Sequence, residues 1–173
     1  RCAIRCVVVA VVAVLLWRVR AADLGQLPLH PLMVSGPLLS SREPDPLCGF
    51  AGFAHDDPRW EVDQQELTRM TRTLEHRGPD DEGFHSAHGV GLGFRRLSII
   101  DPAHGHQPLV LPDQTFALVG NGEIYNYSEL AEELRRDGCR LATGSDMEVV
   151  LHLFAKEGSA CFQRLEGMFA LAI

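Results

Sequence analysis

A cysteine lies in an unusual setting in the stretch PLCGFAGF, residues 46–53, where small residues alternate with large apolar ones. Its thiol is the best protein nucleophile for acyl transfer, provided that a nearby group accepts its proton. A lone cysteine in an apolar strand is more often a buried structural residue. The stretch alone therefore favours a structural role for Cys48, and a chemical role depends on what else the chain supplies.

A cluster of histidines and acids offers a different chemistry. It comprises His85, His88, His104, His106, Asp80, Asp81 and Glu82. Imidazole and carboxylate groups suit transition metals. The segments favour strand and loop, however, and none of the spacings of zinc enzymes occurs in them. We therefore expect no metal site, and a metal-binding protein stays the minor alternative.

The composition is that of one globular domain. Hydrophobic residues make up 46% and charged residues 23% of the chain, which supplies a real core. The chain has a net charge of -7, and residues 48–173 alone have a net charge of -9, from 20 acidic and 11 basic groups, so no nucleic-acid-binding surface is expected. The five cysteines form no C-x-x-C pair and predict neither a disulfide framework nor a zinc knuckle.

The first 47 residues differ from the rest. Residues 2–17 are an apolar stretch that suits a secretory signal or an anchor, although a bilayer span needs about 20 apolar residues. Residues 21–47 hold five of the ten prolines and have no periodicity, as is typical of a linker. A third interpretation is that this segment is not part of the mature protein. We divide the chain into residues 1–47, an apolar segment with a Pro-rich linker, and a domain at residues 48–173.

The elements that must position the chemistry begin after Leu47. Residues 48–54 predict a short buried strand. Asp63 and Glu66 form a capping box for an amphipathic helix that Gly78 ends. Strand-like runs follow at 84–100 and 115–121.

The second half of the domain is richer in helix. Asn121-Gly122 between apolar runs is typical of a hairpin turn. Two helices are expected after it, with Ser128 and Ser145 as caps and Gly138 and Gly158 as their ends. Strands with intervening helices, but few tight βαβ units, predict an α+β fold.

Seven segments resemble one known family in their order and approximate spacing. They are CGFAGF, HRGPDDEG, FRRLSIID, GHQPL, NGEIYNYSEL, GSDMEVVLHLF and GMFALAI. Together they resemble the class II glutamine amidotransferase domain at the front of glutamine-hydrolysing asparagine synthetases. The resemblance covers residues 48–173 nearly throughout and none of residues 1–47. It implies a four-layer αββα sandwich of the N-terminal-nucleophile hydrolase type.

Two departures from the family stand out. The family begins at its cysteine once an initiator Met is removed, whereas Leu47 precedes Cys48 here. The sequence also stops at Ile173, where the sheet of the domain should continue, so we expect the fold to be incomplete at its C-terminus and the last strand to have an unpaired edge.

The resemblance makes Cys48 the nucleophile. Its own α-amino group, which titrates at about pH 8 in an unperturbed chain, would accept the thiol proton. This role requires Cys48 to be the first residue of the working protein. We therefore expect residues 1–46 to be absent from that protein, with Leu47 marking a non-AUG start codon, or a propeptide to be cleaved at the Leu47–Cys48 bond.

The resemblance also assigns the groups that hold glutamine. The side-chain amide of Asn121 and the backbone N–H of Gly122 would be the oxyanion donors. Arg96 would grip the α-carboxylate of glutamine through its planar fork. The alternative is that Arg96 is an ordinary surface arginine, but this role suits its neighbour Arg95 better.

Three further residues complete the implied site. Glu123 and Asp146 would accept the α-ammonium group of glutamine. Their alternatives are a polar strand position for Glu123 and a charge at a helix start for Asp146. Arg77 would order the loop over the site as a supporting residue.

The implied function is the glutaminase half of a glutamine-hydrolysing asparagine synthase. L-Glutamine would yield ammonia through a cysteine thioester, and a C-terminal synthetase domain in cis, absent from this sequence, would use ATP and Mg to amidate aspartate. This fragment itself would need no cofactor. The alternatives are an amidotransferase for another carboxylate acceptor and a membrane-anchored non-catalytic module. We expect a cytoplasmic enzyme with no nucleic-acid partner and no membrane attachment, and a homodimer stays open.

Overall fold

Two antiparallel sheets organise the chain. The computed structural model describes residues 12–14, 48–57, 59–87, 89–97 and 105–173. The first sheet has the order β2-β4-β3 and consists of β2 (Gly49–Ala54), β4 (Val90–Arg96) and β3 (Asp81–Ala87). The second has the order β1-β7-β6-β5 and consists of β1 (Val12–Val14), β7 (Gly167–Ala172), β6 (Ala117–Ile124) and β5 (Leu109–Val110).

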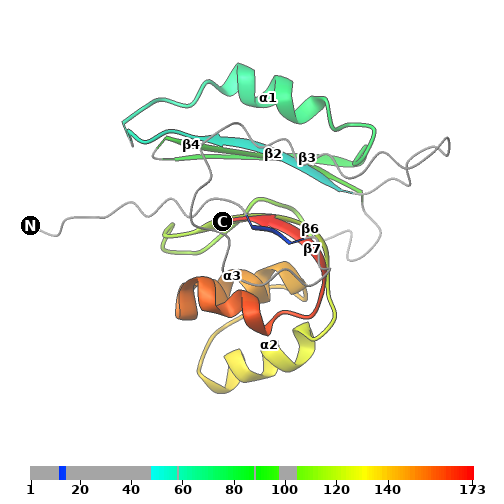
Figure 1. Ribbon diagram of the computed structural model, residues 1–173, viewed down its shortest axis with the longest axis vertical. Coiled ribbons are helices and arrows are strands. Elements are labelled where there is room, and N and C mark those ends of the chain that lie inside the picture. Colours follow the sequence, from blue (N-terminus) through cyan, green and yellow to red (C-terminus); the bar gives the residue numbers. More distant parts are fainter. Residues whose placement is uncertain (1–11, 15–47, 58, 88, 98–104) are drawn as a thin grey trace, which may run out of the picture.

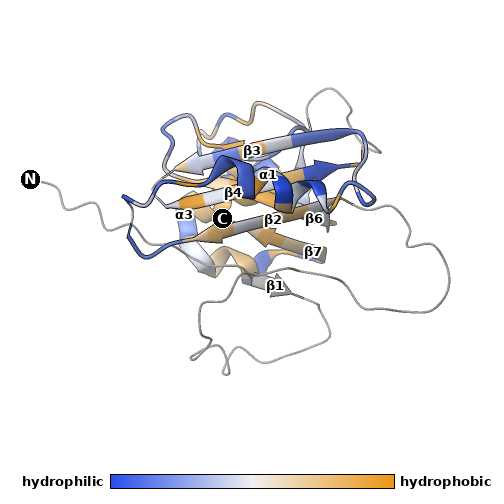
Figure 2. Cartoon of the chain, turned by 90° about the horizontal axis from the view of Figure 1, so that it is seen from above, coloured by the Kyte–Doolittle hydropathy of each residue, from blue (hydrophilic) through white to orange (hydrophobic). Residues whose placement is uncertain are grey.

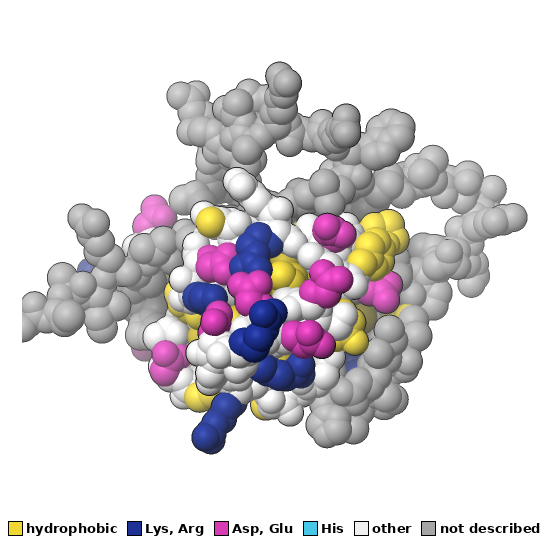
Figure 3. Space-filling view, turned by 90° about the horizontal axis from the view of Figure 1, so that it is seen from below, with side chains coloured by type: hydrophobic (Ala, Val, Ile, Leu, Met, Phe, Trp, Pro, Cys, Tyr) yellow, Lys and Arg dark blue, Asp and Glu magenta, His cyan; other side chains and the backbone are white. Residues whose placement is uncertain are grey.

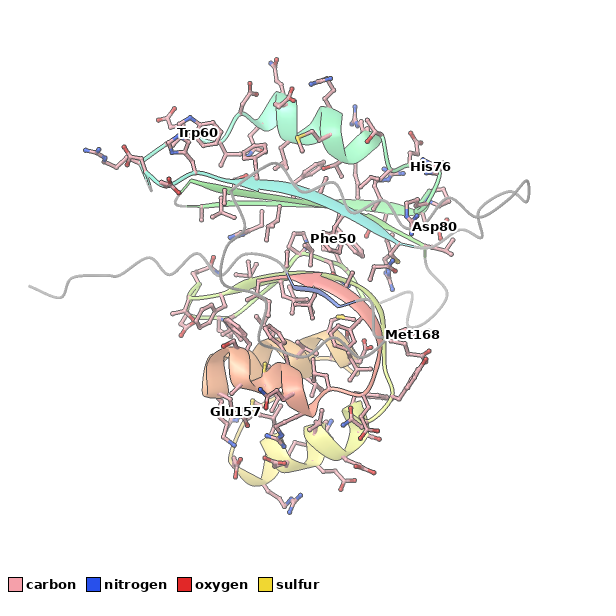
Figure 4. The ribbon with its side chains drawn as sticks, viewed as in Figure 1. Phe50, Trp60, His76, Asp80, Glu157 and Met168 are labelled. Atoms are coloured by element: carbon pink, nitrogen blue, oxygen red, sulfur yellow. The ribbon has the colours of Figure 1, made fainter. Side chains whose placement is uncertain are left out.

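Helices cover the outer faces of the two sheets (Figure 1). α1 (Gln64–Arg72) lies on the first sheet, whereas α3 (Asp146–Glu157) lies on the second, with α2 (Tyr127–Arg136) packed against α3. A 3₁₀ helix, η1 (Gly158–Arg164), leads from α3 to β7. The sheets face each other, and Figure 4 shows Phe50 of β2 between them. The chain therefore has the expected α+β architecture.

The first half of strand β6 is buried on both faces because it separates two apolar clusters. Leu118 belongs to the large cluster formed with α2 and α3, whereas Val119 packs with Leu92 and Phe94 of the facing sheet. Neither Leu118 nor Val119 has exposed surface. Successive side chains of a strand point to opposite faces, so these two residues fix the orientation of the whole strand. Figure 2 shows the hydrophilic residues of α1 above strands that are largely hydrophobic.

The helix signals in the sequence are confirmed in part. Asp63 Oδ1 accepts hydrogen bonds from the backbone N–H groups of Gln65 and Glu66, and Ser145 caps α3. Helix α1, however, ends at Arg72, and a series of turns continues to Gly78.

The expected cap of α2 was wrong. Ser128 lies inside the helix, and Asn126 is the N-cap residue without a capping hydrogen bond from its side chain. The side chain of Asn126 instead binds the backbone on both sides of Leu165, by donating to the carbonyl of Arg164 and accepting from the N–H of Glu166. A long-range contact thus replaces the local cap.

The hairpin turn expected at Asn121-Gly122 was also wrong. Both residues lie within β6, where they pair with Ala170 and Phe169 of β7. A partner strand from the end of the sequence overrides the local preference of Asn-Gly for a turn. Gly122 has a φ of 128°, and a Cβ there would collide with the backbone of Met168 and Phe169, so this position requires glycine.

The outer edge of β7 is paired rather than open. β1 pairs antiparallel with Phe169–Leu171 of β7, which corrects the expectation of an unpaired last strand. Apart from β1, the apolar stretch at residues 2–17 lies outside the described residues. Within the described residues, no helix combines the length and the hydrophobicity needed to cross a bilayer.

Candidate active site

Strand alternation directs three of the candidate residues into the space between the sheets. Phe50, Phe94 and Val119 belong to the cluster between the sheets. Cys48, Arg96 and Asn121 each lie two positions along the chain from one of these core residues, and side chains two positions apart share a face. In the pairing of β2 with β4, Gly49 lies opposite Arg95, so Cys48 and Arg96 are both next to that pair.

The two halves of the site lie at the same end of the facing sheets. The backbone N–H of Asp80 donates to the carbonyl of Arg96 at 3.0 Å, and Met168 pairs with Glu123. Figure 4 shows Asp80, which directly precedes β3, and Met168 of β7 on the same side of the molecule. The Arg96 end of β4 therefore lies on the same side as the Glu123 end of β6.

Cys48 is half-buried and held by two backbone contacts. The N–H of Leu97 points to the Cys48 Sγ at 3.3 Å, and the thiol lies 3.7 Å from the Leu97 carbonyl oxygen. Arg77 Nε donates to the Cys48 carbonyl at 3.4 Å. Leu97 therefore contacts the sulfur of Cys48, whereas Arg77 fixes its main chain.

The other described thiols are poor nucleophiles. Burial, together with the charge of Glu148, raises the pKa of the Cys139 thiol above its usual value. Burial raises the pKa of Cys161 to about 11. Both thiols are therefore protonated at neutral pH, which leaves Cys48 as the candidate nucleophile among the described cysteines.

Arg95 and Arg96 have opposite surroundings because they point to opposite faces of β4. Arg95 faces α1, where it donates to the carbonyl of Gly78 at 2.8 Å and contacts Glu82 at 3.2 Å. With 7% of its surface exposed, Arg95 is not the surface arginine expected from the sequence. Arg96 is equally buried, at 6% exposure, on the face toward the second sheet.

Asp146 joins the start of α3 to the end of β6. Its Oδ2 accepts from the N–H of Ile124 at 2.9 Å, and its Oδ1 accepts from the N–H of Met147 at 2.8 Å. Burial raises the pKa of Asp146 even though these N–H groups lower it, and the charge of Glu123 adds to the rise. A cation placed between Glu123 and Asp146 would relieve that repulsion.

Gln107, to which the sequence alone assigns no role, connects the two halves of the site. Its side-chain amide makes two hydrogen bonds to Gly120, directly before Asn121. The main chain of Gly105 lies against the Arg96 guanidinium, where a Cβ would collide. The signal in the sequence that could have indicated Gln107 is its position as a polar residue inside the GHQPL segment. No spacing rule, however, identifies the residue that it contacts.

Two of the described residues of the metal alternative contact each other. His106 Nδ1 pairs with Asp81 Oδ2 at 2.7 Å. In the part of the chain that the structure describes, no group of three potential ligands could hold a metal ion. His88 and His104 lie outside that part.

The face formed by α2 and α3 has charges of both signs (Figure 3). Arg164 pairs with Glu133 and Glu157, and Lys156 pairs with Asp137. Opposite charges that neutralise one another create no extended positive field on this face.

Fold and site together define an α+β protein in which a thiol, a guanidinium and strand amides lie on facing sheets, as amide-transfer chemistry requires. Residues 47–173 match the family model described as "Glutamine amidotransferase domain". The chain belongs to this family.

Curated relatives agree with this assignment. Asparagine synthetase [glutamine-hydrolyzing] 1 of Bacillus subtilis is 47% identical over 130 residues, which cover 73% of this chain and 20% of the relative. Asparagine synthetase [glutamine-hydrolyzing] 3 of Arabidopsis thaliana is 38% identical over 127 residues, or 73% of this chain and 22% of the relative. The chain thus spans about a fifth of the length of these relatives.

Proposed function

We propose that this chain is the glutamine-hydrolysing part of an asparagine synthase. The observation that carries the proposal is that Cys48 and Arg96 lie at one sheet and Asn121 on the facing sheet, in a chain that belongs to the amidotransferase family. The order of layers in Figure 1, with α1, the two sheets, and α3 with α2, also supports an αββα sandwich of the N-terminal-nucleophile hydrolase type.

In the proposed reaction, the α-amino group of a mature Cys48 takes the thiol proton, and the sulfur attacks the carboxamide carbon of L-glutamine. The carbonyl oxygen becomes an oxyanion. The amide nitrogen is protonated as the C–N bond breaks, so ammonia leaves and a thioester remains. Water then attacks the thioester, which releases glutamate and restores the thiol. Nucleophile and base belong to the same residue.

The N–H directions along β6 support Gly122 as an oxyanion donor. Every second N–H of an extended strand faces the same edge. The N–H of Gly120 is directed to Gln107 and the N–H of Ile124 to Asp146. Gly122 lies between them, and we infer that its N–H faces the same edge, where the Asn121 amide would complete the pair.

Charge supports the placement of the amino-acid end of glutamine. Arg96 is buried on the face toward the other sheet, where its planar guanidinium suits a bidentate contact with the α-carboxylate. Glu123 and Asp146 repel each other, and the α-ammonium group would reduce that repulsion. Each carboxylate oxygen of Asp146 accepts a hydrogen bond from one backbone N–H group and can accept a further hydrogen bond.

The full-length protein should make asparagine. We propose that a synthetase domain with ATP and Mg activates aspartate and receives the ammonia, as the names of the relatives suggest. With glutamine and ATP present, aspartate should stimulate pyrophosphate release several-fold, and asparagine should appear in equal amount. Pyrophosphate release without a response to aspartate, but with a response to another carboxylate, would identify a different acceptor.

The free α-amino group of the mature protein should belong to Cys48. The proposed base exists only if no residue precedes Cys48, so intact mass and N-terminal sequencing of the natural protein should place the first residue there. An amine at any other residue would exclude both a start at Leu47 and a cleavage after it. A chain that kept the preceding residues would have no free α-amine beside the thiol.

A further inference from the structure

Gln107 is a buried polar residue whose two hydrogen bonds both go to one glycine. Its Nε2 donates to the Gly120 carbonyl at 3.1 Å, and its Oε1 accepts from the Gly120 N–H at 2.6 Å. The side chain is among the few buried polar ones, with 8% of the residue exposed. Gly120 is buried as well.

The side chain replaces a missing strand neighbour. Leu109 of β5 pairs with Leu118 of β6, and continuing that register would place residue 107 opposite Gly120. The ladder stops at Leu109, and the intervening Pro108 has no N–H to donate. A carboxamide has the same donor and acceptor as a peptide group, so Gln107 satisfies both polar groups of Gly120, each of which would be costly to bury unpaired.

The segment with Gln107 also contacts the opposite sheet. His106 pairs with Asp81 of β3, and Gly83 of β3 lies so close to the Gln107 carbonyl that a Cβ would collide with it. Gly105 lies against the Arg96 guanidinium. Residues 105–107 therefore connect the β3 and β4 side of the site to β6.

We propose that Gln107 is a positioning residue for the oxyanion donors, a role that rests on the proposed function. Gly120 directly precedes Asn121, so the amide of Gln107 fixes the main chain from which the Asn121 side chain and the Gly122 N–H extend. Asp146 fixes the same edge of β6 at Ile124. The two anchors hold Gly122 from either side.

Gln107→Met is the primary test, because it keeps the length of the side chain and removes both hydrogen bonds. In the full-length protein, the kcat for glutamine hydrolysis should fall about 10- to 100-fold, part of the loss that removal of an oxyanion donor causes. The matched control is Gln65→Met on the exposed side of α1, which should keep the wild-type kcat.

Two readouts separate positioning from a general loss of structure. Alkylation of Cys48 by iodoacetamide forms no oxyanion, so its rate in Gln107→Met should stay within about twofold of wild type. In combination with Asn121→Ala, the loss in kcat should be smaller than the product of the two single losses, because both changes act on one group of donors.

Gln107→Glu provides a second variant with a pH signature. The ionised carboxylate can accept from the Gly120 N–H but would repel its carbonyl, whereas the protonated acid both donates and accepts, as glutamine does. Burial favours the protonated form and raises the pKa of the introduced group. The ratio of variant to wild-type kcat should therefore rise as pH falls from about 7.5 to about 5.5.

Three results would overturn the positioning role. The first is an unchanged kcat in Gln107→Met, and the second is a double variant with Asn121→Ala whose loss in kcat equals the product of the two single losses. The third is an alkylation rate that falls as much as kcat does. If Gln107→Met does not fold, a flat pH ratio for Gln107→Glu overturns it instead. Failure of the proposed function looks different: the wild-type protein would lack glutaminase activity, or Cys48→Ala would retain it.

Discussion

Cys48→Ala should abolish glutamine hydrolysis while the fold survives. The side chain is half-buried at the start of β2, so its loss leaves no large cavity. Removing a catalytic nucleophile costs about 10⁴-fold or more in kcat. The measurement is glutamate formation from L-glutamine by the full-length protein with Cys48 as its first residue. Cys48→Ser should also be inactive if the reaction needs the thiolate.

Two controls make this result specific. Cys139→Ala removes another half-buried thiol, which contacts His152 at 3.2 Å, and should keep glutaminase activity. Ammonium salt should restore asparagine formation in Cys48→Ala, because it replaces the product of the missing step. Glutamate formation that persists in Cys48→Ala would show that another group attacks the amide.

Local sequence signals predicted the elements that are determined by residues close to one another in the chain. The CGFAGFA segment forms β2, and Asp63 and Ser145 cap α1 and α3 as expected. Caps and strand alternation involve residues within a few positions of one another, and this proximity makes them readable from one sequence.

The wrong predictions involve partners that are distant in sequence. Asn121-Gly122 forms part of a strand because β7 begins 45 positions after Gly122 and pairs with it. Ser128 does not cap α2, because Asn126 is fixed at the helix start by the backbone at Arg164 and Glu166. Neither partner is visible in the local pattern.

The candidate site was predicted through ordered motifs, whereas its internal connections were not. The sequence indicated Cys48, Arg96 and Asn121 as separate positions. The structure adds that Arg77 binds the main chain of Cys48 and that Asp146 binds the main chain of Ile124. Side chains that hold a backbone group leave no periodic signal, so contacts such as that of Gln107 require the fold.

Asn121→Ala should lower the kcat for glutamine hydrolysis about 100- to 1000-fold with a small change in KM. The Asn121 side chain shares the face of Val119, which packs between the sheets, so it points toward the sheet that contains Arg96 and that Cys48 directly precedes. A donor aimed at the oxyanion stabilises the transition state more than bound glutamine, and its loss therefore appears in kcat. Steady-state glutaminase kinetics measure both parameters.

Asn126→Ala is the matched control, five positions along the chain. Asn126 holds the backbone of Arg164 and Glu166 by hydrogen bonds of 2.8 and 3.1 Å, and we assign it no contact with substrate. Its loss should lower the unfolding temperature and leave kcat near the wild-type value. Asn121 is only half-buried within β6, so Asn121→Ala should do the reverse, with a normal unfolding temperature and a low kcat. If Asn121→Ala instead lowers stability and keeps kcat, the side-chain amide is a structural group and Gly122 must stabilise the oxyanion without it.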